Sequence, residues 1–231
     1  MNIVLVPGFW LDGSSWDEVA RPIRLAGHEV IALTPPGRDS LGADRAGIGI
    51  ADHVAAVVDA IDGIDGHVVL VGHSGGGPTI YGAVDARPQR VVRTIYVDSF
   101  PLPDGFPIND SLPAVGDSIP LPPWDFFQEA DLVDLDEDLR ESFRARAIPE
   151  ARRVAYDRQS LSDESRRHVP ATVITCEFPI AQIEAFIAQE VPMVAELAAL
   201  KDVEYVELPT GHWPQFTKPE ELAEAILAAL R

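Results

Sequence analysis

A serine between glycines is the feature of this chain that could do chemistry. Ser74 lies within a Gly-x-Ser-x-Gly pattern that spans residues 72–76. An apolar run at 67–71 and the segment 77–84 flank it, which predicts a strand, a sharp turn and a helix. Such a turn exposes the hydroxyl at a helix N-terminus, where a developing negative charge is stabilised, and it requires small neighbours. The pattern alone also fits a glycine-rich turn whose serine has no chemical task.

A serine hydroxyl needs a general base to take its proton, and His212 has the position that a base needs. It lies in the Gly- and Pro-bounded loop 208–214, after the last predicted strand and before the last predicted helix. That loop leaves the carboxyl edge of a parallel sheet, the edge at which Ser74 is also expected. His73, inside the turn, is expected to point away from the serine. The alternative is a loop histidine without a function.

Strands and helices that alternate along the chain must position these two residues. Short apolar runs predict strands at 3–6, 29–33, 67–71, 91–97, 172–176 and 203–208. Helices are predicted from a capping box at Ser15 to about residue 26, at 50–61, after Ser74 to about residue 87, around 180–200 and after Pro219. The alternation predicts an α/β fold with a mostly parallel sheet covered by helices on both faces. Residues 1–100 and 169–231 would form this core.

Residues 101–168 interrupt the alternation. The segment contains no convincing strand, and its first third is rich in proline. Its middle is acidic, which indicates a solvated face, and about 136–159 has helical character. We interpret it as a largely helical cap over the carboxyl ends of the strands, where ligands bind in open α/β sheets. A plain surface excursion is the alternative.

Composition limits the possible partners. The 231 residues suffice for one substantial core, and the formal net charge of −19 disfavours nucleic acid and anionic membranes as partners. The single Cys176 cannot form an internal disulfide. The sequence begins without the features of a secretory signal and has no apolar run of membrane-spanning length. We therefore expect a cytoplasmic protein without a membrane span, and no cofactor or metal.

Over its whole length the chain resembles the α/β-hydrolase superfamily. The matching segments are 4–10 with Trp16, 35–40, the turn around Ser74, and 211–214 with 218–220. The early first strand is similar to that of the compact methylesterase and hydroxynitrile-lyase branch and of small bacterial esterases. The resemblance implies an oxyanion hole made by the backbone N–H groups of Phe9 and Gly75. Pro7 replaces the family's usual histidine, which should leave a main-chain hole intact.

The family also implies an acid that orients the histidine, and the sequence offers two positions for it. Glu177 follows the strand at 172–176, near the commoner position, where the family usually has an aspartate. Asp98 ends the strand at 91–97, a place that some haloalkane dehalogenases use. A dyad without an acid is a third reading.

The resemblance implies acyl transfer to water. A serine nucleophile excludes the dehalogenase and epoxide hydrolase reactions of this fold, which need a carboxylate nucleophile. We expect a serine hydrolase that cleaves a small, largely apolar carboxylic ester or lactone through an acyl-enzyme on Ser74. Hydroxynitrile lyases carry a lysine where this chain has Trp213. A lyase-like activity, a cofactor-free perhydrolase and a non-enzymatic small-molecule binder remain as alternatives.

Aromatic side chains near the catalytic edge and in the segment 101–168, which we call the insertion, predict an apolar pocket. We assign substrate contacts to Trp10, Phe100, Trp124 and Trp213. Some of the aromatic residues are expected only to seal the cap onto the core.

Overall fold

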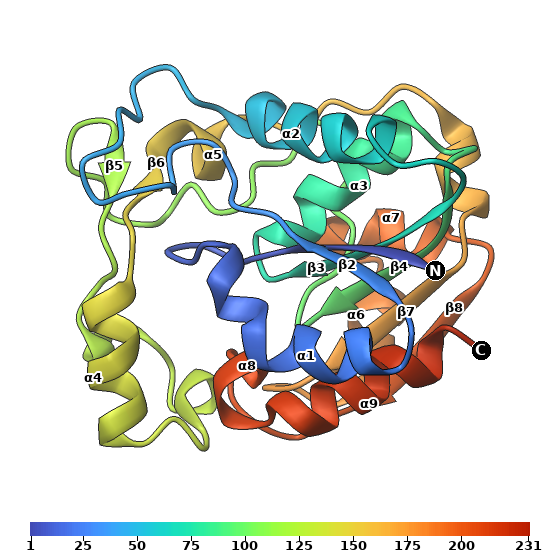
Figure 1. Cartoon of the computed structure of the whole chain (residues 1–231). Coiled ribbons are helices and arrows are strands. Elements are labelled where there is room, and N and C mark those ends of the chain that lie inside the picture. Colours follow the sequence, from blue (N-terminus) through green and yellow to red (C-terminus); the bar gives the residue numbers. More distant parts are fainter.

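Six parallel strands form the central sheet of the computed structural model, which describes residues 1–231 (Figure 1). In spatial order they are β2 (Glu29–Ala32), β1 (Asn2–Val6), β3 (Val68–His73), β4 (Val91–Val97), β7 (Ala171–Thr175) and β8 (Val203–Glu207). All neighbouring pairs are parallel. From β1 the chain first adds β2 on one side, and β3 then pairs with β1 on its other side. The loops after β1 and β3 therefore diverge, and ligand sites usually lie at such a switch point. The six predicted strands are confirmed.

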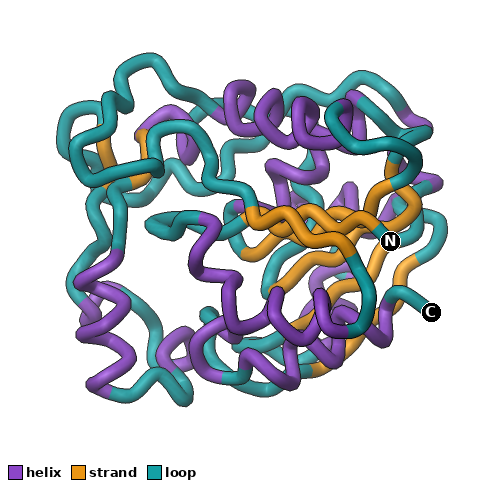
Figure 2. Tube along the Cα trace, viewed as in Figure 1, coloured by secondary structure: helices purple, strands orange, loops and turns teal.

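Helices cover both faces of the sheet (Figures 1 and 2). One layer consists of α1 (Asp17–Leu25) and α9 (Pro219–Ala229), which pack against each other. The other layer consists of α2 (Ile50–Asp62), α3 (Gly76–Ala86), α6 (Ile180–Ala188) and α7 (Ala195–Ala199). A short α8 (Pro214–Thr217) precedes α9. None of the helices is both long enough and apolar enough to cross a bilayer.

The central strands are apolar on both faces because both faces are buried. In β1, Ile3 and Leu5 pack with the α1 and α9 layer, whereas Val4 and Val6 pack with the α2 and α3 layer. All four side chains are almost fully buried. A strand that is covered on both sides reads as a continuous apolar run, which is why these strands were visible in the sequence.

The predictions for two helices were wrong, one in its start and one in its continuity. The first helix begins at Asp17, because residues 13–16 form a 3₁₀ turn that Asp12 caps by accepting a hydrogen bond from Ser14 N–H at 2.9 Å. The predicted helical segment 180–200 divides into α6 and α7, with a 3₁₀ turn that starts at Pro192 between them. Proline cannot donate the backbone hydrogen bond that a continuous helix requires.

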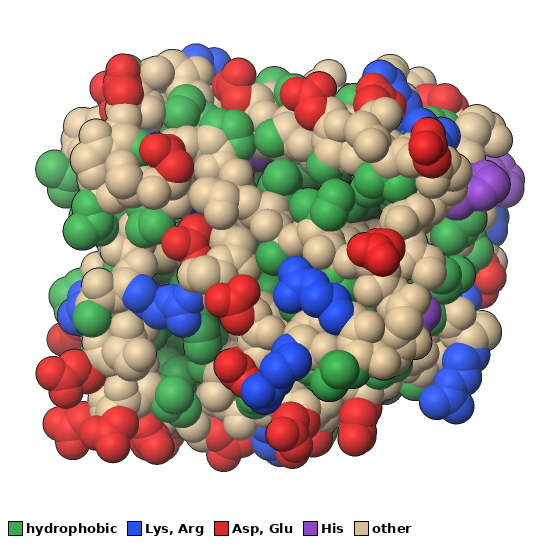
Figure 3. Space-filling view, viewed as in Figure 1, with side chains coloured by type: hydrophobic (Ala, Val, Ile, Leu, Met, Phe, Trp, Pro, Cys, Tyr) green, Lys and Arg blue, Asp and Glu red, His purple; other side chains and the backbone are tan.

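Residues 101–168 hold α4 (Glu137–Arg146), α5 (Arg152–Tyr156) and an antiparallel pair of two-residue strands, β5 (Ser118–Ile119) and β6 (Glu150–Ala151). The short strands were not predicted, and the predicted helical stretch is interrupted between α4 and α5. A third apolar cluster joins this segment to the loop after β1 and to Trp213. Acidic side chains gather at the lower left of the surface, over α4, and those of α4 itself are exposed (Figure 3).

Candidate active site

Ser74 occupies a strained turn between β3 and α3. Its φ of 50° lies in the left-handed region, which non-glycine residues rarely adopt. A Cβ atom added at Gly72 would lie 2.6 Å from the Gly76 carbonyl oxygen, and one at Gly76 would lie 2.6 Å from the Val6 carbonyl oxygen. Ser99 Oγ donates to the Ser74 carbonyl oxygen at 2.7 Å. The glycines therefore allow the close approach of strand and helix that exposes the hydroxyl.

His212 reaches this hydroxyl from the loop between β8 and α8. Its Nε2 lies 2.8 Å from Ser74 Oγ. The backbone of the insertion holds the loop, because Asp131 C=O accepts from His212 N–H at 2.8 Å and Val133 C=O accepts from Gly211 N–H at 3.0 Å. His73 Nε2 donates to the His212 carbonyl oxygen at 2.6 Å. The imidazole is thus fixed from the insertion on one side and from the serine turn on the other.

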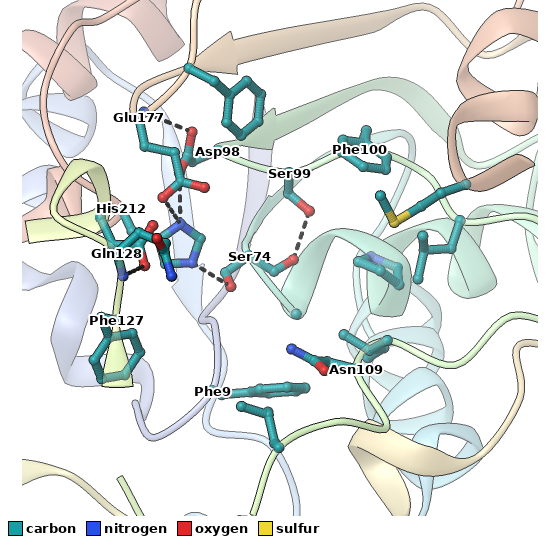
Figure 4. Close-up of a pocket in the computed structure, with 18 of the residues that line it drawn as sticks. Phe9, Ser74, Asp98, Ser99, Phe100, Asn109, Phe127, Gln128, Glu177 and His212 are labelled. Carbon is teal, nitrogen blue, oxygen red and sulfur yellow. Dashed lines mark hydrogen bonds and ion pairs between the residues drawn. The ribbon is translucent and has the colours of Figure 1, made fainter. Parts of the chain in front are cut away.

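Both candidate acids lie at Nδ1 of His212 (Figure 4). Asp98 Oδ2 is 2.6 Å from Nδ1 and Glu177 Oε2 is 3.3 Å from it. The Asp98 carboxylate is buried, and its other oxygen accepts from the backbone N–H groups of Cys176 and Glu177, at 2.8 and 3.3 Å. Glu177 is partly exposed. Asp98 therefore lies closer to Nδ1 and is the more deeply buried of the two, and Glu177 is a second carboxylate beside it.

The carboxylates set the charge balance of the site. Burial alone lowers the pKa of His212, but the hydrogen bonds and negative charges of Asp98 and Glu177 outweigh it and raise the pKa above its ordinary value. Asp131 has a pKa raised to about 6 by burial and by the neighbouring Glu177 carboxylate. An imidazolium that forms at His212 would therefore lie in a strongly negative environment.

Two backbone N–H groups near the serine turn are left without an acceptor. Neither Phe9 N–H nor Gly75 N–H donates a hydrogen bond within the protein. The Phe9 ring lies over Gly75, where an added Cβ would come within 2.6 Å of the ring. Trp10 has a φ of 65°, so the loop after β1 is strained like the serine turn. An oxyanion hole needs such unpaired backbone donors, and these are the two that the sequence analysis assigned to it.

A cavity of about 620 Å³ opens in front of Ser74. Phe9, Phe100, Asn109, Phe127 and Gln128 are among its walls (Figure 4). The lining contains three carboxylates and no lysine or arginine. Much of the wall comes from the segment that follows β4, which contributes Ile108, Asn109, Ser111, Leu112, Phe126, Phe127, Gln128 and Asp131.

The structure brings only part of the predicted substrate contacts to this cavity. Trp10 and Phe100 line it, whereas Trp124 and Trp213 do not. Trp213 is fully buried and packs edge-on against Trp124 and Phe127, with ring centroids 6.0 and 5.3 Å away. These two tryptophans support the wall from behind.

Asp98, Glu177 and His212 are the only three side chains whose potential metal-ligating atoms cluster within 4.8 Å. His212 Nδ1 is hydrogen-bonded to Asp98, and an ionised carboxylate there accepts a proton that Nδ1 carries. A ring nitrogen that carries a proton has no lone pair for a metal. The arrangement fits a proton relay better than a metal centre.

Sequence reasoning missed Asp131 and Ser99, which touch the relay or the serine turn. Asp131 belongs to an acidic stretch of the insertion, and nothing in its sequence distinguishes it from its exposed neighbours. Ser99 follows Asp98 directly, but its contact depends on how the chain turns after β4. Only the three-dimensional packing identifies both residues.

Comparisons with known proteins agree with this fold. The chain is 29% identical to a carbendazim hydrolyzing esterase from Nocardioides sp. over 98% of each chain, and 26% identical to a pyrethroid hydrolase from Sphingobium wenxiniae over 97% of this chain and 86% of the relative. An extracellular alpha/beta-hydrolase from a Paenibacillus species superposes with a TM-score of 0.77, at 22% identity and over 99% and 98% of the two chains. A methylesterase from Arabidopsis gives a TM-score of 0.77 at 16% identity, over 100% and 98%. The model of the family described as "Alpha/beta hydrolase family" matches residues 3–225, so the chain belongs to the α/β-hydrolase family.

Proposed function

We propose that the protein is a carboxylic ester hydrolase that cleaves small, largely apolar esters or lactones through an acyl-enzyme on Ser74. The observation that carries the proposal is the unbroken line of hydrogen bonds from Asp98 through His212 to Ser74, at 2.6 and 2.8 Å. The names of the two curated relatives, an esterase and a pyrethroid hydrolase, support the same class of reaction.

Acylation begins when Ser74 Oγ attacks the substrate carbonyl carbon and His212 Nε2 takes the hydroxyl proton. The imidazolium keeps its Nδ1–H on Asp98, which holds the ring orientation and stabilises its charge. The substrate carbonyl oxygen becomes an oxyanion between the N–H groups of Phe9 and Gly75. The C–O bond to the alcohol then breaks, and His212 gives its proton to the departing alkoxide.

Deacylation repeats these steps with water as the nucleophile. Neutral His212 takes a proton from water as the water oxygen attacks the acyl carbon. The oxyanion again forms beside Phe9 and Gly75. When the bond to Ser74 breaks, His212 returns the proton to Oγ, and the carboxylic acid leaves.

The cavity favours neutral substrates. Its walls are largely apolar and aromatic, and its volume of about 620 Å³ accommodates a small organic molecule. The lining offers no lysine or arginine to a substrate carboxylate, while Asp98, Asp131 and Glu177 would repel one. We extend the proposal to the insertion 101–168, which would act as a cap over the substrate.

Hydrolysis of p-nitrophenyl butyrate by the wild type and by Ser74→Ala tests the proposal. We expect the variant to lose at least about 10⁴-fold in kcat, because no other group can form the acyl-enzyme. Ser160→Ala is the matched control, because Ser160 is exposed and makes no hydrogen bond, and it should retain wild-type turnover. Equal turnover by wild type and Ser74→Ala would refute the proposal.

Each of the alternative functions named in the sequence analysis predicts a different observation. A lyase of the hydroxynitrile type would need a cation after the histidine, but that position is the buried Trp213 and no lysine lines the cavity. A non-enzymatic binder would bind esters without Ser74-dependent turnover. A perhydrolase would use the same residues, and hydrogen peroxide added to the ester assay would then yield a peracid.

A further inference from the structure

A buried ion pair lies behind the loop that carries the Phe9 N–H donor. Arg38 comes from the loop after β2, and Glu150 comes from β6 in the insertion. Their side chains are 2% and 0% exposed and in direct contact. Glu150 also accepts a hydrogen bond from Ala151 N–H at 2.8 Å. Burying two charges costs several kcal/mol per ion unless each is well paired, so the pair needs an explanation beyond stability.

Arg38 contacts both ends of this loop. One nitrogen of its guanidinium, Nη1, donates to the carbonyl oxygens of Gly8 and Leu11, the latter at 2.9 Å. Its Cζ lies 6.0 Å from the centre of the Phe9 ring. Between the two carbonyls lies Trp10, with its φ of 65°. Arg38 therefore closes the loop into a fixed and strained conformation.

The Gly8 carbonyl and the Phe9 N–H belong to the same peptide group. In a trans peptide, which is planar, the C=O and N–H bonds point in opposite directions. This chain has no cis peptide, so a Gly8 oxygen held by Arg38 turns the Phe9 N–H the opposite way. A hydrogen bond from a cation to this oxygen also polarises the peptide and makes its N–H a stronger donor.

We propose that Arg38 is a positioning residue for the oxyanion hole, and that Glu150 from the insertion holds and neutralises it there. The inference rests on the function proposed above. It assigns the insertion a second task beside lining the cavity. The insertion also binds the same loop through Ile148 N–H, which donates to Trp10 C=O at 2.9 Å, and through Ile119 C=O, which accepts from Trp10 Nε1 at 3.1 Å.

The test replaces both charges together, as Arg38→Met with Glu150→Met, so that no unpaired charge stays buried. Kinetics on p-nitrophenyl butyrate are compared with inhibition by an aryl trifluoromethyl ketone, whose adduct with Ser74 carries an oxyanion. We expect kcat to fall by about 10²-fold, the loss typical of one oxyanion donor, with KM changed by less than about threefold. The inhibition constant of the ketone should rise by a similar factor as kcat falls.

A matched control removes another buried pair. Arg166 and Glu196 lie 2.8 Å apart, are 4% and 6% exposed, and do not line the cavity. Their double replacement by methionine should lower the melting temperature but leave kcat and the inhibition constant near wild type. If the two double variants lose the same activity, Arg38 has only a structural role and the inference is wrong.

Arg38→Lys keeps the charge but offers one nitrogen in place of the planar guanidinium. We expect the kcat and the ketone inhibition constant of this variant to lie between those of the wild type and the double variant. If the double variant does not fold, Arg38→Lys alone tests the inference. Wild-type values in Arg38→Lys would then overturn the inference. The proposed function fails separately, if Ser74→Ala retains turnover.

Discussion

The sheet core and the insertion contribute different things to the same site. Ser74 and Asp98 follow central strands, and His212 follows an edge strand, so the core carries the three residues of the proposed relay. The insertion supplies much of the cavity wall and two backbone carbonyls that hold the His212 loop. The core positions groups through regular strand ends, whereas the insertion positions them through individual hydrogen bonds. In the proposed function the core therefore carries the reacting groups, while the alignment of these groups depends on both regions.

The largest effect is expected within the core, at the acid. Asp98→Asn should lower kcat by about 10³–10⁴-fold, because an amide cannot stabilise the imidazolium and favours the wrong imidazole tautomer. Glu177→Gln should lower kcat by less than about tenfold, since its contact with Nδ1 is longer and more exposed. Steady-state kinetics on p-nitrophenyl butyrate measure both. A larger loss in Glu177→Gln than in Asp98→Asn would reverse the assignment of the acid.

The next largest loss of kcat is expected where the His212 loop of the core contacts the insertion. A Cβ atom added at Gly211 would lie 2.4 Å from Asp131 O and 2.6 Å from Val133 O. We expect Gly211→Ala to displace His212 and to lower kcat by about 10²-fold, since a shift of about 1 Å is enough. Gly42 has nothing within 4 Å of the added atom, so Gly42→Ala is the control. Wild-type kcat in Gly211→Ala would mean that the insertion does not hold the histidine.

The core could be predicted from the sequence because its signals are local. Strands such as β1 and β3, buried on both faces, read as apolar runs, and the glycines around Ser74 reflect contacts within one turn. Placing Ser74 and His212 at one sheet edge then needed only the parallel topology. The choice between Asp98 and Glu177 could not be made from the sequence, because it depends on the φ of 45° at Asp98 and on backbone donors just after the neighbouring strand β7.

The insertion could not be predicted to the same degree. Its apolar residues follow neither a helical nor a strand period. Contacts with distant parts of the chain therefore decide which way an aromatic side chain points. Trp124 has the residue type of a pocket wall, yet it packs with Trp213 of the core in the cluster behind the wall. Asp131 reaches Glu177 and the His212 loop across a long stretch of chain. Such contacts leave no pattern in a single sequence.

The smallest effect should appear in the pH profile. Glu177 contributes to the raised pKa of His212, and only the neutral imidazole can take the Ser74 proton. Removing its charge lowers the pKa of His212, so the acidic limb of kcat/KM in Glu177→Gln should move to lower pH. Glu224 is exposed on α9, so Glu224→Gln controls for the loss of one charge. An unmoved limb, or one that moves to higher pH, would contradict this role of Glu177.

The central claim is that His212 activates Ser74, and covalent labelling tests it most directly. A fluorophosphonate probe reacts with a serine only when its hydroxyl is activated, and peptide mass spectrometry locates the adduct. We predict one adduct, on Ser74, and a labelling rate that falls by at least about 10³-fold in His212→Ala. An adduct on another residue, or wild-type labelling of Ser74 in His212→Ala, would contradict the account.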